Sequence, residues 1–188
     1  GEKQVSMLEF PEIAEHSIII DSESKRYSMC GVRIGCLVTR SKTLHDAAMK
    51  FAQARLSPVL IGQILATAAH DNDAEYIQSV REEYTKRRNL LVELLNEIPG
   101  VKCPTPKGAF YCVAKFPVDD AEKFCQWLLE DFEFEGQTVM MAPANGFYST
   151  PGAGKQEARI AYVLNQDSLK KAVECLRVAL QVYPGRTN

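Results

Sequence analysis

Two short runs carry most of the chemical information in this sequence: Ser22-Glu23-Ser24-Lys25 and Gly31-Val32-Arg33-Ile34-Gly35. A lysine amine can bond covalently to an aldehyde, and a hydroxyl together with a guanidinium can bind a phosphate dianion. The pattern therefore favours a site for a phosphorylated aldehyde. In this interpretation Lys25 is the nucleophile, and Ser22 and Arg33 are the phosphate ligands.

Two strands are expected to flank this segment. Residues 17–21 are a β-branched run typical of a buried strand, and residues 32–39 alternate in part and are a second candidate. The polar segment between them is the kind of loop that carries functional groups on a rigid frame. We expect Gly31 and Gly35 to allow a tight backbone turn around Arg33.

Helices are predicted next along the chain. Residues 43–55 form the first, and the second begins at Pro58, which suits a first helical turn. The apolar residues 58–69 are typical of a buried helix and are too few to cross a bilayer. A long segment at residues 73–97 has helical periodicity and ends before Pro99-Gly100.

The last third of the chain predicts a small α+β unit. Asp119 is expected to cap a helix, with Glu122 three residues later as in a capping box. The predicted strands are residues 109–114, 138–141 and 159–164, and the predicted helices are residues 119–132 and 167–183.

Composition narrows the class of protein. The 188 residues suffice for one domain or two small ones, and contents of 46% hydrophobic and 24% charged residues exclude a disordered tail or a fibre. The formal charge of −2 lacks the basic surplus of a nucleic-acid-binding module, so no nucleic-acid partner is expected. The sequence has no membrane-spanning run and no signal-peptide pattern, so we expect a cytoplasmic protein without a membrane partner.

The six cysteines do not indicate a metal site. No two of them have the C-x-x-C spacing, and the three histidines do not cluster with them, so no metal is expected. Several cysteines lie in apolar runs, as Cys112 does, and these are expected to be reduced core thiols in a reducing compartment.

The runs around Lys25 and Arg33 resemble the pyridoxal-phosphate (PLP) lysine motif of class I/II, fold type I aminotransferases, which reads Ser-x-Ser-Lys and then Gly-x-Arg-Ile-Gly. Three later segments resemble the same family in the same order and spacing, and the aspartate aminotransferase group is the closest. They are residues 106–111, which match a turn and strand, residues 142–154, which match a Gly-rich loop, and residues 157–162, which match the strand bearing the substrate-carboxylate arginine.

The resemblance implies a role for each matching residue. Lys25 would form the Schiff base with PLP and move protons, while Ser22 and Arg33 would bind the PLP phosphate. Arg159 would grip the α-carboxylate of the amino acid as a bidentate fork. The implied enzyme is an aminotransferase that uses an amino acid, with aspartate expected, and a 2-oxo acid, and it is a homodimer.

The resemblance also implies the fold, which is α/β. Residues 1–72 would be the end of the large PLP-binding domain, residues 73–97 a long interdomain helix, and residues 98–188 a small α+β domain. The chain would thus match the C-terminal half of the family. The family's Asp beneath the pyridine nitrogen lies upstream of this half, and the ring is a poor electron sink without it, so the fragment alone is expected to be inactive.

Other interpretations of the same residues stay open. Lyases, decarboxylases and synthases share this cofactor and fold, because fold does not determine reaction type. A non-catalytic, aminotransferase-like sensor domain is a further alternative. A lone lysine is usually a surface residue, Arg33 could serve a structural ion pair, and an arginine such as Arg159 is common on a partly exposed strand. Ser24 is more simply a local backbone hydrogen-bonder.

Overall fold

The computed structural model describes residues 4–71 and 73–187. The chain divides after Val80 into two compact units, so the long helix α4 (Asp73–Asn96) begins in the first unit and continues in the second. The helices and strands give an α/β composition, as expected. The assignment of residues 1–72, 73–97 and 98–188 to parts of larger domains stays a prediction.

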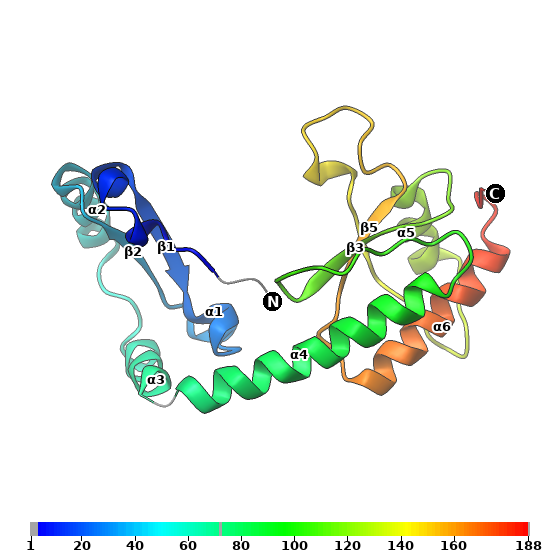
Figure 1. Ribbon diagram of the computed structural model, residues 1–188, viewed down its shortest axis with the longest axis horizontal. Coiled ribbons are helices and arrows are strands. Elements are labelled where there is room, and N and C mark those ends of the chain that lie inside the picture. Colours follow the sequence, from blue (N-terminus) through cyan, green and yellow to red (C-terminus); the bar gives the residue numbers. More distant parts are fainter. Residues whose placement is uncertain (1–3, 72, 188) are drawn as a thin grey trace. The chain divides into compact units, whose positions relative to one another are not determined.

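The first unit is built around a two-stranded antiparallel ribbon, visible in Figure 1 as β1 and β2. The register runs from Ile18 opposite Thr39 to Ser22 opposite Gly35. The elements in chain order are η1 (Met7–Glu9), η2 (Pro11–His16), β1 (Ile18–Ser22), α1 (Glu23–Arg26), η3 (Cys30–Val32), β2 (Gly35–Thr39), α2 (Lys42–Arg55) and α3 (Leu60–His70).

Burial in the first unit differs from the sequence-based expectation. The strand at Ile18–Ser22 is confirmed, but Ile20 is 79% exposed rather than buried. Helix α3 begins at Leu60 instead of Pro58, and Ile61 is 68% exposed. A two-stranded ribbon is too small to bury apolar side chains on both faces, so these runs lack a covering layer among the described residues.

The second unit is an antiparallel α+β arrangement with the strand order β3-β5-β4. Figure 1 shows α6 alongside the C-terminal part of α4, and both helices contribute to one core. Besides the rest of α4, its elements are β3 (Tyr111–Lys115), α5 (Ala121–Glu130), β4 (Ala142–Pro143), η4 (Asn145–Phe147), β5 (Glu157–Ala161) and α6 (Gln166–Val182).

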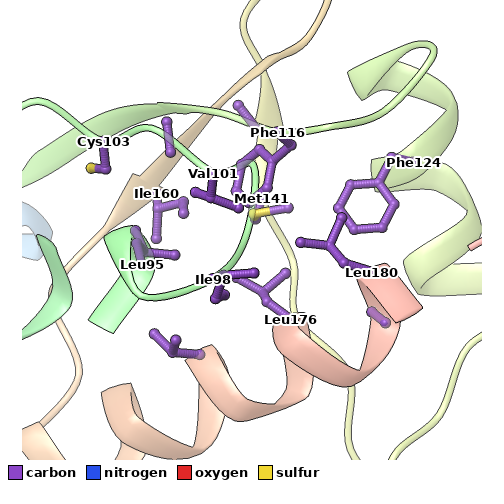
Figure 2. Packing of buried hydrophobic residues seen from close by; sticks show 14 of the residues in the cluster. Leu95, Ile98, Val101, Cys103, Phe116, Phe124, Met141, Ile160, Leu176 and Leu180 are labelled. Carbon is purple, nitrogen blue, oxygen red and sulfur yellow. The ribbon is translucent and has the colours of Figure 1, made fainter. Parts of the chain in front are cut away.

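The core of the second unit lies on one face of this sheet. In β3 and β5, Cys112 lies opposite Ile160 and Ala114 opposite Ala158, and all four are buried. Figure 2 shows how helix residues complete this cluster. They include Leu95 of α4, Phe124 of α5 and Leu176 and Leu180 of α6. Because side chains alternate along a strand, Tyr111, Val113 and Arg159 occupy the opposite face.

The bounds of all three strands in this unit were predicted wrongly, and a local contact or conformation accompanies the first two differences. The first strand begins at Tyr111 rather than residue 109, because Ala109 has a positive φ of 63°. The strand predicted at residues 138–141 is instead Ala142–Pro143, and Thr138 donates its hydroxyl proton to the Leu128 carbonyl of α5. The following strand begins at Glu157, so Arg159 lies at its centre.

The cap of α5 is Asp120 and not Asp119. Oδ1 of Asp120 accepts hydrogen bonds from the backbone N–H groups of Glu122, at 2.9 Å, and Lys123, at 3.4 Å. Asp119 accepts instead from the Tyr183 hydroxyl at 3.0 Å and thereby ties the end of α6 to the start of α5. Both carboxylates accept hydrogen bonds from groups at helix ends, but only Asp120 is the N-cap of α5.

Four cysteines, Cys103, Cys112, Cys125 and Cys175, are buried free thiols, as expected for core residues, whereas Cys30 and Cys36 are exposed. Within residues 4–71 and 73–187, no group of three or more His, Cys, Asp or Glu side chains could hold a metal ion. In the same part of the chain, no helix combines the length and the apolar character that a membrane crossing requires.

The stability of the second unit is expected to fall in alkali because of Tyr183. Burial, reinforced by the hydrogen bond to Asp119, raises the pKa of Tyr183 to about 12. An unfolded tyrosine has a pKa of about 10. The folded chain therefore binds more protons than the unfolded chain between these two pH values, and the free energy of unfolding decreases as the pH rises through this interval.

Urea unfolding followed by the fluorescence of Trp127, the only tryptophan, measures this decrease. Tyr183→Phe should flatten it. Part of the slope should persist, because burial raises the pKa of Cys125 to about 11. Tyr76→Phe, in the first unit, is the matched control. An unchanged slope in Tyr183→Phe would contradict the assignment.

Candidate active site

The ladder between β1 and β2 closes the segment that carries Lys25 into a loop. Ser22 is the last residue of β1 and lies opposite Gly35, the first residue of β2. Directly beyond this pair, the Glu23 N–H donates to the Ile34 carbonyl at 3.2 Å. Residues 23–34 therefore leave and re-enter the ribbon at one place, and Lys25 and Arg33 belong to the same closed loop.

Lys25 lies on the single helical turn α1, which Ser22 caps. The Ser22 Oγ accepts a hydrogen bond from the Ser24 N–H at 3.1 Å, a typical N-cap contact. The Lys25 side chain is exposed, while Glu23 on the same turn is buried. The turn thus presents the amine outward from a base that is fixed in the unit.

Arg33 makes the tight turn that was predicted for the neighbouring glycines. Its backbone is left-handed, with φ 60° and ψ 42°, and its Nη1 donates to the Cys30 carbonyl at 2.8 Å. Neither Gly31 nor Gly35 has a positive φ. Gly35 is required for another reason: a Cβ there would lie 2.7 Å from the carbonyl oxygen of Asp21 on the paired strand.

The groups in this loop fit a phosphate. The Ser22 hydroxyl reaches the Ile34 carbonyl only at 3.5 Å, which is a weak contact, so its proton can be given to an anion. A guanidinium has five N–H donors. Within the described residues, the guanidinium of Arg33 makes one hydrogen bond, to the Cys30 carbonyl. Both side chains are exposed. Ser22 and Arg33 therefore retain donors for a phosphorylated ligand, next to the Lys25 turn.

Arg159 lies in the second unit, on the sheet face away from the core. It is half-buried and lies opposite Val113 of β3 and Ala142 of β4. Its guanidinium carbon lies 5.1 Å from the ring centre of Tyr111 and 4.8 Å from that of Phe147. Among residues 4–71 and 73–187, no side chain or backbone group forms a hydrogen bond or ion pair with this guanidinium. The guanidinium is thus held by two aromatic rings while its donors stay available to a carboxylate.

The loop that carries Phe147 is fastened to its surroundings. The Asn145 amide donates to Oε2 of Glu122 at 2.9 Å, and the Tyr148 hydroxyl donates to Oε2 of Glu157. This second hydrogen bond, together with burial, raises the pKa of Tyr148. Gly154, with φ +73°, allows the Tyr148 ring to approach, since a Cβ there would lie 2.6 Å from it.

The sequence alone did not reveal which side chains contact Arg159, or which ones hold the turn that carries Lys25. Tyr111 and Phe147 lie inside segments that were recognised, but only their contact with Arg159 shows what they do. Glu23 and His70 were not considered together, although Glu23 is an acidic residue at a position between the two serines of the lysine run. Their contact joins residues 47 apart in the chain, and no local pattern signals it.

Comparison with known proteins assigns the family. A sequence model of aminotransferase class I and II matches residues 5–176. The chain belongs to this family. Members of the family generally depend on PLP, and known members include enzymes named aspartate aminotransferase.

The aminotransferase relatives resemble the chain in sequence and structure. An aspartate aminotransferase of Bacillus subtilis is 29% identical over an alignment of 188 residues. The match covers 94% of this chain and 44% of that protein. The crystal structure of the aspartate aminotransferase from Rhizobium meliloti superposes with a TM-score of 0.71 at 28% identity, over 86% of this chain and 41% of that one. A substrate-bound BacF structure from Bacillus subtilis gives a TM-score of 0.82 at 27% identity, over 100% of this chain and 46% of that one. The chain therefore spans less than half the length of these relatives.

Proposed function

We propose that the protein carrying this chain is a PLP-dependent aminotransferase that transfers an amino group between aspartate and a 2-oxo acid. One observation carries the proposal. Lys25 lies on a turn capped by Ser22, in the same closed loop as Arg33, and both Ser22 and Arg33 retain donors for a phosphate. Membership of the aminotransferase family supports the same reaction class.

The chain's residues would divide the work at the cofactor. Bound PLP supplies an aldehyde for an amino group and a ring that takes up electrons. Ser22 and Arg33 would hold the phosphate by charge-assisted hydrogen bonds, which fixes the distance from the phosphate to the Lys25 turn. The Lys25 amine would be the group that bonds to the aldehyde, and when displaced by substrate it would carry a proton to and from the substrate Cα.

Arg159 would bind the α-carboxylate of the substrate. Its guanidinium is half-buried and has no anionic partner within the described residues, so it can bind a carboxylate by donating two parallel hydrogen bonds. The rings of Tyr111 and Phe147 limit the directions in which the planar group can turn. The homodimer, the cytoplasmic location and the inactivity of this chain by itself stay predictions.

Covalent labelling tests the proposal directly. Addition of PLP to the complete protein should produce a visible absorption band, and borohydride reduction followed by peptide mapping should place the modification on Lys25. Lys42→Ala is the matched control, because Lys42 is an exposed lysine of the same unit that pairs with Asp46. Labelling should persist in this variant. Modification of other lysines alone, or of none, would contradict the proposal.

A further inference from the structure

Three hydrogen-bonded side chains join the Lys25 turn to helix α3 within the first unit. The Tyr27 hydroxyl lies 3.1 Å from Nδ1 of His70, and Nε2 of His70 lies 3.1 Å from Oε1 of Glu23. The rings of Tyr27 and His70 also meet edge to face, with centroids 5.3 Å apart. His70 is the last residue of α3, so one side chain holds two points of a distant turn. We call these three residues the His70 clamp.

The His70 clamp contacts the face of the turn that lies opposite Lys25. Glu23 and Tyr27 are four residues apart and therefore share one face of a helical turn, while Lys25, midway between them, lies on the other face. Burial agrees with this geometry: Glu23 is 9% exposed and Tyr27 is 7% exposed, whereas Lys25 is exposed. Any rocking of the turn that moves the Lys25 amine also moves both clamp contacts.

A single neutral form of His70 satisfies both contacts. With its proton on Nε2, the imidazole donates to Glu23 and accepts from the Tyr27 hydroxyl. This tautomer is assigned from its partners. Because both ring nitrogens are used, the ring cannot rotate without losing a hydrogen bond. The clamp therefore determines an orientation as well as a distance.

Stability does not account for a carboxylate at this place. Glu23 is buried, and its Oε2 has no hydrogen-bond partner within the described residues. A buried carboxylate with incomplete pairing generally gives no more stability than an apolar side chain of similar size. What the Glu23–His70 contact supplies is a directional tie between α3 and the turn.

We propose that His70, through Glu23 and Tyr27, is a positioning residue that orients the Lys25 amine for its reaction with the PLP aldehyde. The inference rests on the proposed function, because it assigns the clamp to the site where Lys25 reacts. His70 touches neither cofactor nor substrate in this assignment. Its effect on Lys25 passes through the backbone of the turn.

The test uses three forms of the complete protein: wild type, His70→Phe and His70→Gln. Phenylalanine keeps a ring against Tyr27 and removes both hydrogen bonds, whereas glutamine restores a donor toward Glu23. One measurement is backbone hydrogen exchange at residues 24–27 without cofactor. The other is the rate at which the borohydride-trapped adduct forms at Lys25 with limiting PLP.

We expect His70→Phe to speed the exchange and to slow trapping by about tenfold each, with His70→Gln recovering most of both rates. His45→Phe is the matched control, because His45 is an exposed histidine on α2 that contacts Asp46, and it should behave as wild type. If His70→Phe does not fold, Tyr27→Phe removes a single hydroxyl from the same clamp and should shift both rates in the same direction.

The outcomes separate the two proposals. Normal wild-type labelling together with wild-type rates in His70→Phe, or in Tyr27→Phe when it replaces that variant, overturns the clamp alone. A loss that His70→Gln does not relieve also overturns it, since the tie to Glu23 would then not be the cause. Absence of any Lys25 adduct in the wild-type protein overturns the proposed function, and the clamp's assignment with it.

Discussion

Replacement of Lys25 by alanine is expected to reduce transamination by the complete protein by about 10⁴-fold or more and to abolish the borohydride-trapped adduct. The alanine variant lacks both the nucleophile and the group that moves the proton at the substrate Cα. Because the Lys25 side chain is exposed, the free energy of unfolding should change by less than about 0.5 kcal/mol. The loss should therefore be chemical rather than structural.

Lys25→Arg separates the effect of losing the reactive amine from the effect of losing its positive charge. The guanidinium keeps the positive charge beside the phosphate site, but it stays protonated and cannot attack an aldehyde. It should be as inactive as the alanine variant, whereas Lys42→Ala should retain full activity. Steady-state rates with aspartate and 2-oxoglutarate, together with mass spectrometry of the reduced protein, measure all three variants. Appreciable turnover by Lys25→Ala would remove the basis of the assignment.

Replacement of Arg159 by lysine is expected to lower kcat/KM for the amino acid by about 100-fold, mainly through a higher KM. A lysine ammonium can neutralise a carboxylate but cannot form two parallel hydrogen bonds with it. The ammonium group is also smaller than the planar guanidinium and would pack less well against the rings of Tyr111 and Phe147. Labelling of Lys25 by PLP should not change, because Arg159 is not assigned to the cofactor.

Arg177→Lys is the matched control for this experiment. Arg177 lies on α6 in the same unit, and its Nε donates to Glu174 at 3.1 Å. Its replacement should leave kcat/KM unchanged. Titration of the amino acid against each variant yields KM and kcat separately. An unchanged KM in Arg159→Lys would show that another group binds the carboxylate.

The frame of the candidate site was predictable because it depends on local pattern. The β-branched run before Lys25 predicted a strand that the structure has at Ile18–Ser22. The partial alternation over residues 32–39 predicted a second strand, which the structure has only at Gly35–Thr39, because the backbone at Arg33 is left-handed. Its burial was not predictable in the same way. Ile20 reads as a core residue, yet it is 79% exposed, since burial requires a second layer that the pattern of one strand cannot provide.

The conformation of the loop shows the same division. The spacing of Ser22, Lys25 and Arg33 indicated a phosphate and amine site, and the strand pairing puts Lys25 and Arg33 in one closed loop that begins directly after Ser22. The tight turn was attributed to Gly31 and Gly35, whereas the left-handed backbone is at Arg33 itself. Sequence preference favours glycine for such a turn, but here the Arg33 side chain donates to the Cys30 carbonyl three residues earlier, a contact that residue preference alone does not indicate.

By itself, the sequence determined the residue types that this protein can use: an amine, a hydroxyl and a guanidinium at a loop, and a second arginine on a late strand. Their chemistry is a property of the side chains and needs no coordinates. Tertiary structure decided what holds these groups. His70 meets Glu23 across 47 residues, and Phe147 meets Arg159 across the sheet face away from the core. Such contacts depend on strand register and helix packing, which are set by the whole unit rather than by any short run of residues.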